Sequence, residues 1–446
     1  MSSERSLSQP NIIWIFGDQH RGQALGFRGD PNVRTPHLDR LAREGVCFDR
    51  AISGSPLCCP FRGSLISGLY AHEAVPGHVC PLDPAIPTVA HAFNEQGYNT
   101  AYFGKWHLDG FNEREASVAS HIVPPVRRGG FRTWCAYQNN TGAFNSHVHG
   151  GEGETAFHRQ LPGFETDVLT DLFIEQLRAD ATAGQPFFSV LSVQPPHQPY
   201  VAPEEWMGRY NPAEIILRPN VPPYPAVQDQ VRRDLAGYYA MIENLDWNLG
   251  RIRAALDELG LAYNTHIVFF SDHGDMHGSH GHFRKTSPHE ESIRIPCIIG
   301  GNVPGLKTGV RDHVFNHVDF APTSLGLCGL DIPAGMVGTD YSAERLTDRT
   351  APEYPDSAYL QMIGPTAFRF SVDRPWRGIV TRDGWKYIVL EGQPWMLFNL
   401  NEDPYELVNL AHTRGFTKPR QKLQAELKAW IERTGDNFTL PALSQS

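Results

Sequence analysis

Three short, largely apolar runs, each followed by polar residues, constrain the fold of this 446-residue chain most strongly: Asn11–Phe16, Pro186–Val193 and His266–Phe270. Such runs are typical of strands buried on both faces of a parallel sheet. Asp18 follows the first of these runs, and Asp272 and His273 follow the third. Because open α/β sheets build their sites at the carboxyl ends of their strands, we expect these side chains to meet.

Composition narrows the classes of function. A chain of 446 residues can bury a large core, either as one α/β domain with an appendage or as two to three smaller domains. The formal charge of −10 argues against nonspecific binding to nucleic acid or anionic membranes. The first ten residues are largely polar, and no apolar stretch approaches the length of a membrane span. Seven cysteines, an odd number scattered through a long chain, do not resemble a disulfide framework. We therefore expect a soluble, cytoplasmic protein.

The segment Ser55–Leu65 places a thiol and a cation near a predicted helix start. We expect Pro60 to be the first helical residue, because its missing N–H is not needed there. Cys58 would then lie at the positive end of the helix dipole, with Arg62 one turn further along the helix. The free backbone N–H groups and the guanidinium could together bind an oxyanion beside Cys58. A buried, inert cysteine is the alternative.

Two more segments supply cationic or proton-carrying groups. A strand is expected at Thr100–Phe103, and an extended backbone beyond it would point Lys105 and His107 to the same side. His197 stands among prolines, which suits a proton donor held in place, although a turn histidine bonded to backbone is the alternative. Lys285 supplies a further cation.

The remaining segments predict the scaffold. From about Asp109 to Phe164 the composition favours loops at a pocket mouth, and past about Ala351 a smaller α+β unit is expected, with Asp-Gly in a hairpin turn. Helices are predicted at 35–42 (with Thr35 as N-cap), 88–93, 167–178, 232–259 and 422–434. Later strands are predicted at 296–299, 376–381, 385–390 and 397–400.

The arrangement Cys58-x-Pro60-x-Arg62 resembles the modification signature of the type I sulfatases, in which this cysteine is oxidised to formylglycine. Three further segments also resemble this family: Thr35–Ala42, Tyr102–Leu108 and Val318–Thr323. The resemblance covers roughly residues 10 to 410. It implies an alkaline-phosphatase-like α/β fold, a mixed sheet sandwiched by helices. It also implies a catalytic domain at 1–350 and a C-terminal subdomain at 351–446 with a small antiparallel sheet and a terminal helix.

The resemblance to the type I sulfatases also implies a bound divalent metal ion. Carboxylate and amide ligands from Asp18, Asp272 and Gln19 favour a hard cation such as Ca²⁺, whereas the imidazole of His273 shifts the preference toward Mn²⁺. Cys58, as formylglycine, would be a further ligand. Gln19 and His273 depart from the commonest sulfatase ligand set and resemble the phosphonate monoester hydrolases of the same superfamily, so both metals stay open.

The resemblance also assigns catalytic roles. Arg62, Lys105 and Lys285 would stabilise charge on the transferred sulfuryl group, His197 would protonate the leaving oxygen, and His107 would deprotonate the hydrate at Cys58 to release sulfate. The expected activity is arylsulfatase-like hydrolysis of a small sulfate ester. The expected partners are a small-molecule sulfate ester, a formylglycine-generating maturation enzyme and further copies of the chain in a homo-oligomer.

Two other functions compete with this one. A phosphonate monoester or phosphodiester hydrolase would use the same nucleophile and is supported by Gln19 and His273, while the Lys105-Trp106-His107 segment argues against it. A non-catalytic binding protein would keep the fold with an unmodified Cys58.

Overall fold

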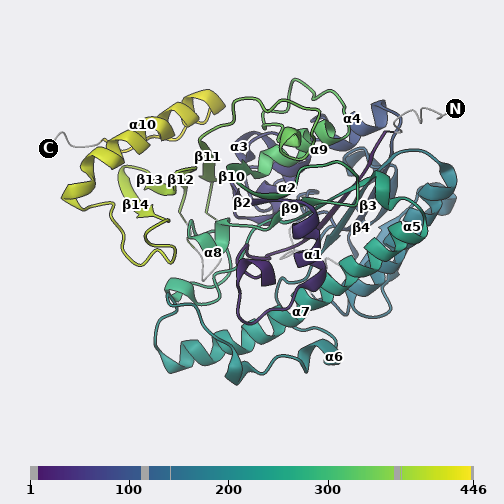
Figure 1. Cartoon of the computed structure of the whole chain (residues 1–446), viewed down its shortest axis with the longest axis horizontal. Helices are drawn as coiled ribbons and strands as arrows, with labels where there is room; N and C mark the ends of the chain where they lie inside the picture. Colours follow the sequence, from purple (N-terminus) through teal and green to yellow (C-terminus); the bar gives the residue numbers. More distant parts are fainter. Residues whose placement is uncertain (1–8, 112–119, 141, 366–371, 373, 443–446) are drawn as a thin grey trace.

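A ten-stranded mixed sheet forms the centre of the computed structural model, which describes residues 9–111, 120–140, 142–365, 372 and 374–442 (Figure 1). In space the strands follow the order β10-β2-β9-β8-β1-β7-β3-β4-β5-β6. Their bounds are β1 Asn11–Gly17, β2 Val46–Ile52, β3 Asn99–Lys105, β4 Thr133–Tyr137, β5 His147–Gly150, β6 Phe157–Gln160, β7 Phe187–Val193, β8 Thr265–Ser271, β9 Cys297–Gly300 and β10 Gly309–Asn316.

Strand β1 lies at the middle of the sheet, parallel to β7 on one side and to β8 on the other. Its last residue, Gly17, pairs with Val193 of β7 and with Ser271 of β8. The chain segments that follow these three strands therefore leave the sheet side by side. This register brings Asp18 next to Asp272, as the apolar runs predicted.

Helices cover both faces of the sheet, and β1 shows why. Ile13 and Ile15 pack with residues of α1 (Pro36–Glu44), α5 (Glu165–Ala183) and α7 (Pro225–Glu258). Ile12, Trp14 and Phe16 pack with residues of α2 (Cys58–Ser67), α4 (Val89–Glu95) and α9 (Phe320–Leu327). Alternate strand residues point to opposite faces, so an unbroken apolar strand needs two helical layers. The short helices are α3 Ala71–Ala74, α6 Glu204–Met207 and α8 Glu290–Ile293.

A four-stranded antiparallel sheet and a long helix form the C-terminal unit, at the left of Figure 1. Its elements are β11 Ser357–Met362, β12 Trp376–Thr381, β13 Trp385–Leu390, β14 Gln393–Asn399 and α10 Thr417–Thr434. The predicted hairpin is confirmed, with Gly384 of its turn at φ 90°. Leu427 and Trp430 of α10 pack against Tyr359 and Tyr387 of the sheet. The domain division at residue 350 remains a prediction.

Two predictions about local structure were wrong. Helix α2 begins at Cys58 rather than at Pro60, with Leu57 as N-cap. The stretch from Asp109 to Phe164 is not only loops, because it contributes β4, β5 and β6 to one end of the sheet. Residues 112–119 and 141 of this stretch lie outside the described residues, as do residues 1–8 of the polar N-terminus.

Within the described parts of the chain, every helix is too short or too polar to cross a lipid bilayer.

Candidate active site

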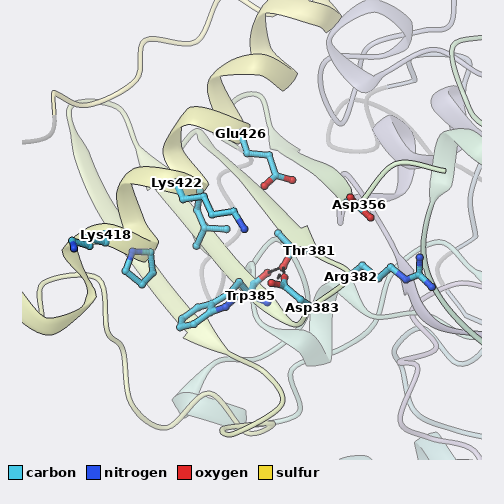
Figure 2. Close-up of a pocket in the computed structure, with 10 residues that line it drawn as sticks. Asp356, Thr381, Arg382, Asp383, Trp385, Lys418, Lys422 and Glu426 are labelled. Carbon is cyan, nitrogen blue, oxygen red and sulfur yellow. Dashed lines mark hydrogen bonds between the residues drawn. The ribbon is translucent and has the colours of Figure 1, made fainter. Parts of the chain in front are cut away.

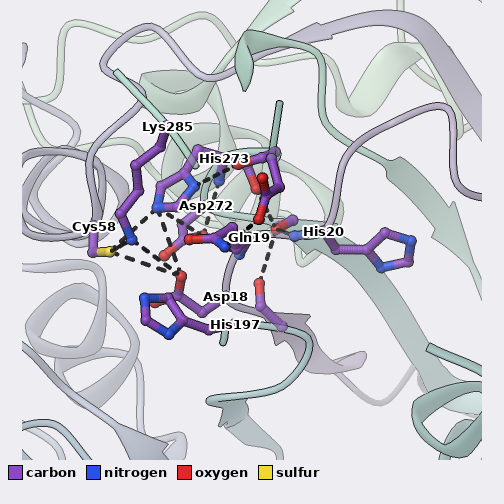
Figure 3. A network of polar contacts seen from close by, with 12 residues as sticks. Asp18, Gln19, His20, Cys58, His197, Asp272, His273 and Lys285 are labelled. Atoms are coloured by element: carbon purple, nitrogen blue, oxygen red, sulfur yellow. Dashed lines mark hydrogen bonds and ion pairs between the residues drawn. The ribbon is translucent and has the colours of Figure 1, made fainter. Parts of the chain in front are cut away.

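Five side chains that the sequence singled out converge at the carboxyl ends of β1 and β8 (Figure 3). Asp18 follows β1, Asp272 and His273 follow β8, and Cys58 is the first residue of α2. Cys58 Sγ lies 3.2 Å from His273 Nε2 and 3.7 Å from Asp18 Oδ1. His273 Nε2 is 3.6 Å from a carboxylate oxygen of each aspartate. Lys285 Nζ completes the group at 3.0 Å from Cys58 Sγ.

Three buried cations surround these acidic groups. Lys105 Nζ donates to Asp18 Oδ2 at 2.7 Å, and Lys285 Nζ lies 3.9 Å from Asp18 Oδ1. Arg62 Nη2 is 3.2 Å from Asp272 Oδ2, and its Nη1 donates to Ser192 Oγ and to the Lys105 carbonyl. Buried charges are stable only when they are paired and hydrogen-bonded, as here. With three cations and two carboxylates, the group has a net positive field that suits an anion.

This field changes the ionisation of the groups inside it. Burial by itself would raise the pKa of Asp18, but Lys105 and Lys285 outweigh it and hold this pKa well below the usual range. Burial and Asp18 raise the pKa of the Cys58 thiol, yet Lys285, Lys105 and His273 bring it below its ordinary value. Position 58 is therefore a site where a negative charge on the side chain is stabilised.

The same residues fit a divalent metal ion. One ligand atom from each of Asp18, Cys58, Asp272 and His273 lies within 4.8 Å of the others. Gln19 adds a fifth donor: its buried Oε1 accepts no hydrogen bond from any residue that the structure describes. Two carboxylates, an amide oxygen and an imidazole suit Ca²⁺ or Mn²⁺, so the set does not separate the two metals.

A residue that the sequence analysis did not single out orients Gln19. Asp275 Oδ2 accepts a hydrogen bond from Gln19 Nε2 at 2.5 Å and another from the Tyr200 hydroxyl. Because a carboxylate can only accept, the Gln19 amide nitrogen must face Asp275 and its oxygen must face away. Asp275 lies three residues after Asp272 in an acidic, histidine-rich turn, which was the only sequence signal for its role.

The two histidines predicted to move protons occupy different surroundings. His197 is partly exposed, its Nδ1 is 2.7 Å from the Gln198 carbonyl, and burial together with Lys285 holds its pKa well below 6.5. His107 is buried, and burial together with Lys105 lowers its pKa strongly. The expected extended backbone at Lys105–His107 was wrong, since His107 has φ 60°. The ring of His107 packs edge to face against His78, with centroids 5.1 Å apart.

A separate hollow of about 780 Å³ lies in the C-terminal unit, between the β12–β13 turn and α10 (Figure 2). It contains none of the residues described above, and its three cationic and three acidic side chains balance in charge. It therefore offers no site for the chemistry that the sequence predicts. Its lining residues are Asp356, Thr381, Arg382, Asp383, Trp385, Lys418, Pro419, Lys422, Leu423 and Glu426.

A model of the sulfatase family matches residues 10–330, and a model of the C-terminal part of N-sulphoglucosamine sulphohydrolase matches residues 278–433. The chain belongs to the sulfatase family. It is similar to the ulvan-active sulfatase of Formosa agariphila, with 35% identity over 97% of this chain and 83% of that protein. It is also similar to an arylsulfatase of Clostridium perfringens, with 26% identity over 97% of this chain and 96% of that protein.

Solved structures confirm the alkaline-phosphatase-like fold of this sulfatase. The phosphonate monoester hydrolase of Agrobacterium radiobacter superposes with a TM-score of 0.76 at 22% identity, covering 95% of this chain and 96% of that one. At this identity the likeness supports the shared fold, and not a shared substrate. The sulfatase resemblance drawn from the sequence is confirmed by the family model, whereas the likeness to the phosphonate monoester hydrolase is one of fold.

Proposed function

We propose that this sulfatase hydrolyses sulfate monoesters in the manner of an arylsulfatase, with Cys58 acting after conversion to formylglycine. The observation that carries the proposal is the position of Cys58. Its side chain starts a helix, is 1% exposed, and lies within 3.7 Å of Lys285, His273 and Asp18 at once. A residue with only a packing role would not need these three charged or titratable neighbours.

A divalent metal ion held by Asp18, Gln19, Asp272 and His273, together with position 58, would supply Lewis acidity and lower the pKa of a hydroxyl at that position. The donor set supports this assignment through the buried Gln19 Oε1 and the clustered carboxylates.

The cations of the site would bind the substrate's sulfuryl oxygens. Arg62 offers a planar fork of donors, and Lys105 and Lys285 offer single ammonium groups, all in a buried setting where electrostatic stabilisation is strong. In the protein without substrate these cations bind Asp18 and Asp272 instead. An anionic ester would compete with the two aspartates for the same donors. These cationic donors are already held in position before the ester binds.

The two histidines would transfer protons at opposite stages. His107 is held neutral, which suits acceptance of a proton from the hydroxyl at position 58 as sulfate departs. His197 is also neutral in the free protein, but a bound sulfate ester brings negative charge that raises the pKa of a nearby imidazole. His197 would then donate its proton to the leaving oxygen.

The decisive experiment combines mass spectrometry with kinetics. Protein made together with a formylglycine-generating enzyme should yield a Cys58 peptide lighter than the unmodified one, and it should turn over an aryl sulfate. Cys58→Ala should abolish turnover while the thermal unfolding midpoint stays near that of the parent. An unmodified thiol in a fully active preparation would contradict the assigned nucleophile, and in an inactive one it would favour the non-catalytic binding protein.

Hydrolysis of phosphonate monoesters or phosphodiesters is the second candidate, because Gln19 and His273 resemble the metal ligands of those hydrolases. One preparation should be assayed with an aryl sulfate and an aryl phosphonate monoester of the same phenol. We expect the sulfate to be preferred, and a large preference for the phosphonate would reverse the order of the two candidates.

The natural ester is best sought among carbohydrate, aryl and choline sulfates. Relatives of this chain include proteins named for ulvan and for aryl sulfates, so a panel should contain sulfated oligosaccharides as well as aryl esters. A cytoplasmic location and a homo-oligomeric state remain predictions, which cell fractionation and light scattering would test.

A further inference from the structure

A second group of metal-binding side chains lies beside the active site. Cys59 is the second residue of α2, His78 belongs to the loop after α3, and His107 follows β3. One ligand atom of each lies within 4.8 Å of the others. Cys59 Sγ is 3.8 Å from His78 Nδ1, and the rings of His78 and His107 are in edge-to-face contact.

We propose that Cys59, His78 and His107 form a regulatory site for a thiophilic divalent cation of the Zn²⁺ class, and that its occupation inhibits the enzyme. One thiolate and two imidazoles are the ligands that Zn²⁺ prefers. A tetrahedral ion with ordinary Zn–S and Zn–N distances holds its ligand atoms about 3.3–3.6 Å apart. The separation of 3.8 Å between Cys59 Sγ and His78 Nδ1 is close to that value before any side chain moves.

The surroundings of the trio supply the other requirements of such a site. Cys59 and His107 are buried, whereas His78 is partly exposed and opens the group to entering ions and to a fourth, water ligand. Cys59 Sγ now donates to the His78 carbonyl at 2.6 Å. On binding, the thiol loses its proton to solvent and the sulfur forms a bond to the ion instead, so no oxidant or reductant is involved.

The two metal sites differ in chemistry although they are neighbours along α2. The trio contains sulfur and nitrogen donors and no carboxylate, whereas the group around Asp18 and Asp272 offers carboxylate oxygens. A hard cation such as Ca²⁺ would favour the carboxylates, and Zn²⁺ would favour the thiolate and imidazoles. Both sites could therefore be filled independently.

Inhibition rests on the proposed function, because His107 is there assigned the role of base. An imidazole nitrogen bound to Zn²⁺ cannot accept a proton from the hydroxyl at position 58. Binding of the ion would thus stop the release of sulfate. A chelator that removes Zn²⁺ would restore activity.

Binding should be measured first, without reference to activity, in the Cys58→Ala background that removes the neighbouring thiol. Co²⁺ added to protein already loaded with Ca²⁺ should produce a thiolate-to-metal charge-transfer band, which added Zn²⁺ abolishes. The band should be lost in Cys59→Ser and retained in Cys80→Ser, a matched change of another thiol near the same loop. A band that persists in Cys59→Ser would overturn the site even if the sulfatase assignment is right.

Inhibition should then be measured on the active enzyme with saturating Ca²⁺. We expect Zn²⁺ to inhibit reversibly, and Cys59→Ser and His78→Gln each to raise the half-inhibiting concentration about tenfold or more, while Cys80→Ser leaves it unchanged. Equal inhibition of all variants would place the inhibitory ion elsewhere and overturn the regulatory role. Since the charge-transfer band does not require turnover, failure of the sulfatase assignment would leave the binding result standing.

Discussion

At the scale of single residues, the candidate site depends on side chains that hold other side chains in place. Asp275 is fully buried and accepts hydrogen bonds from Gln19 Nε2, from the Tyr200 hydroxyl and from the backbone N–H groups of His277 and Arg284. Four donors on one carboxylate fix its position. Asp275 therefore determines which atom of Gln19 faces the candidate metal site.

Replacing Asp275 with Asn should weaken metal binding by about 10- to 100-fold, because the new amide can turn its N–H₂ toward Gln19 and release the orientation of Gln19. Isothermal titration with Ca²⁺ and with Mn²⁺ would measure the change. Asp229→Asn, an exposed change on α7, is the control and should leave the affinity as it was. Unchanged affinity in Asp275→Asn would show that Gln19 needs no such support.

His197→Ala should reduce turnover most for esters with poor leaving groups, because a weakly acidic phenol or alcohol needs a proton as its bond to sulfur breaks. A series of aryl sulfates that spans a range of phenol pKa values would reveal a steeper dependence in the variant than in the parent enzyme. Equal losses along the whole series would exclude His197 as the acid.

The convergence of Asp18, Cys58, Asp272 and His273 could be predicted from the sequence, because each stands directly after a strand or at a helix start. Their roles in catalysis and metal binding remain a proposal. Asp275 and the trio of Cys59, His78 and His107 were not predicted as groups. Their roles come from contacts between distant segments, such as the pair Gln19–Asp275, separated by 256 positions. No local pattern encodes such a contact.

At the scale of elements, close packing of β3 against β7 positions Lys105. Gly104 pairs with Ser192, has φ 94°, and a Cβ atom added there would come within 1.9 Å of the Ser192 carbonyl oxygen. Only glycine allows this approach at that backbone conformation. The next residue is Lys105, whose ammonium group binds Asp18.

Gly104→Ala should therefore lower both stability and activity, since β3 must shift away from β7 and carry Lys105 with it. We expect a loss of more than about 2 kcal/mol of unfolding free energy. Gly97→Ala is a matched control, because Gly97 has φ 81° but no atom within 4 Å of an added Cβ. The control measures the cost of the backbone conformation alone, expected at about 1 kcal/mol. Equal effects in the two variants would contradict the packing explanation.

Helices and strands with a strong apolar periodicity were predicted well from the sequence, whereas the shortest strands were not. The long helix expected at 232–259 is confirmed as the greater part of α7, and the hairpin of β12 and β13 has its predicted bounds. Strands β5 and β6 were missed because each has four residues and carries histidine, arginine or glycine in place of an apolar run. They are strands because they extend an existing sheet, which sequence pattern alone does not reveal.

At the scale of the whole molecule, one buried ion pair connects the end of the chain to the C-terminal sheet. Asp436, just after α10, accepts hydrogen bonds from Arg377 of β12 at 2.7 and 3.1 Å and from the Tyr359 hydroxyl at 2.9 Å. Burial would raise the pKa of Asp436, but the bonds from Arg377 lower it to about 2. The pair holds α10 against the sheet.

This ion pair predicts how stability depends on pH. A carboxylate whose pKa is lower in the folded than in the unfolded state stabilises the fold fully above about pH 4, and this contribution is lost as the pH falls toward 2. Asp436→Asn should cost about 3 kcal/mol at neutral pH, and its difference from the parent should shrink between pH 4 and 2. Denaturant unfolding across this range would measure it, with exposed Asp348→Asn as control. A difference independent of pH would show that the charge of Asp436 is unimportant.

The 1% exposure of Cys58 has a consequence for biogenesis. An enzyme that oxidises a side chain must enclose it in its own catalytic pocket. The Cys58 thiol, at the buried start of α2 and packed against Asp18 and His273, cannot be enclosed while the sulfatase is folded. The proposed conversion of Cys58 to formylglycine would therefore have to occur on the nascent or unfolded polypeptide, before β8 joins the sheet. A molecule that folds with Cys58 unmodified could then not be activated afterwards.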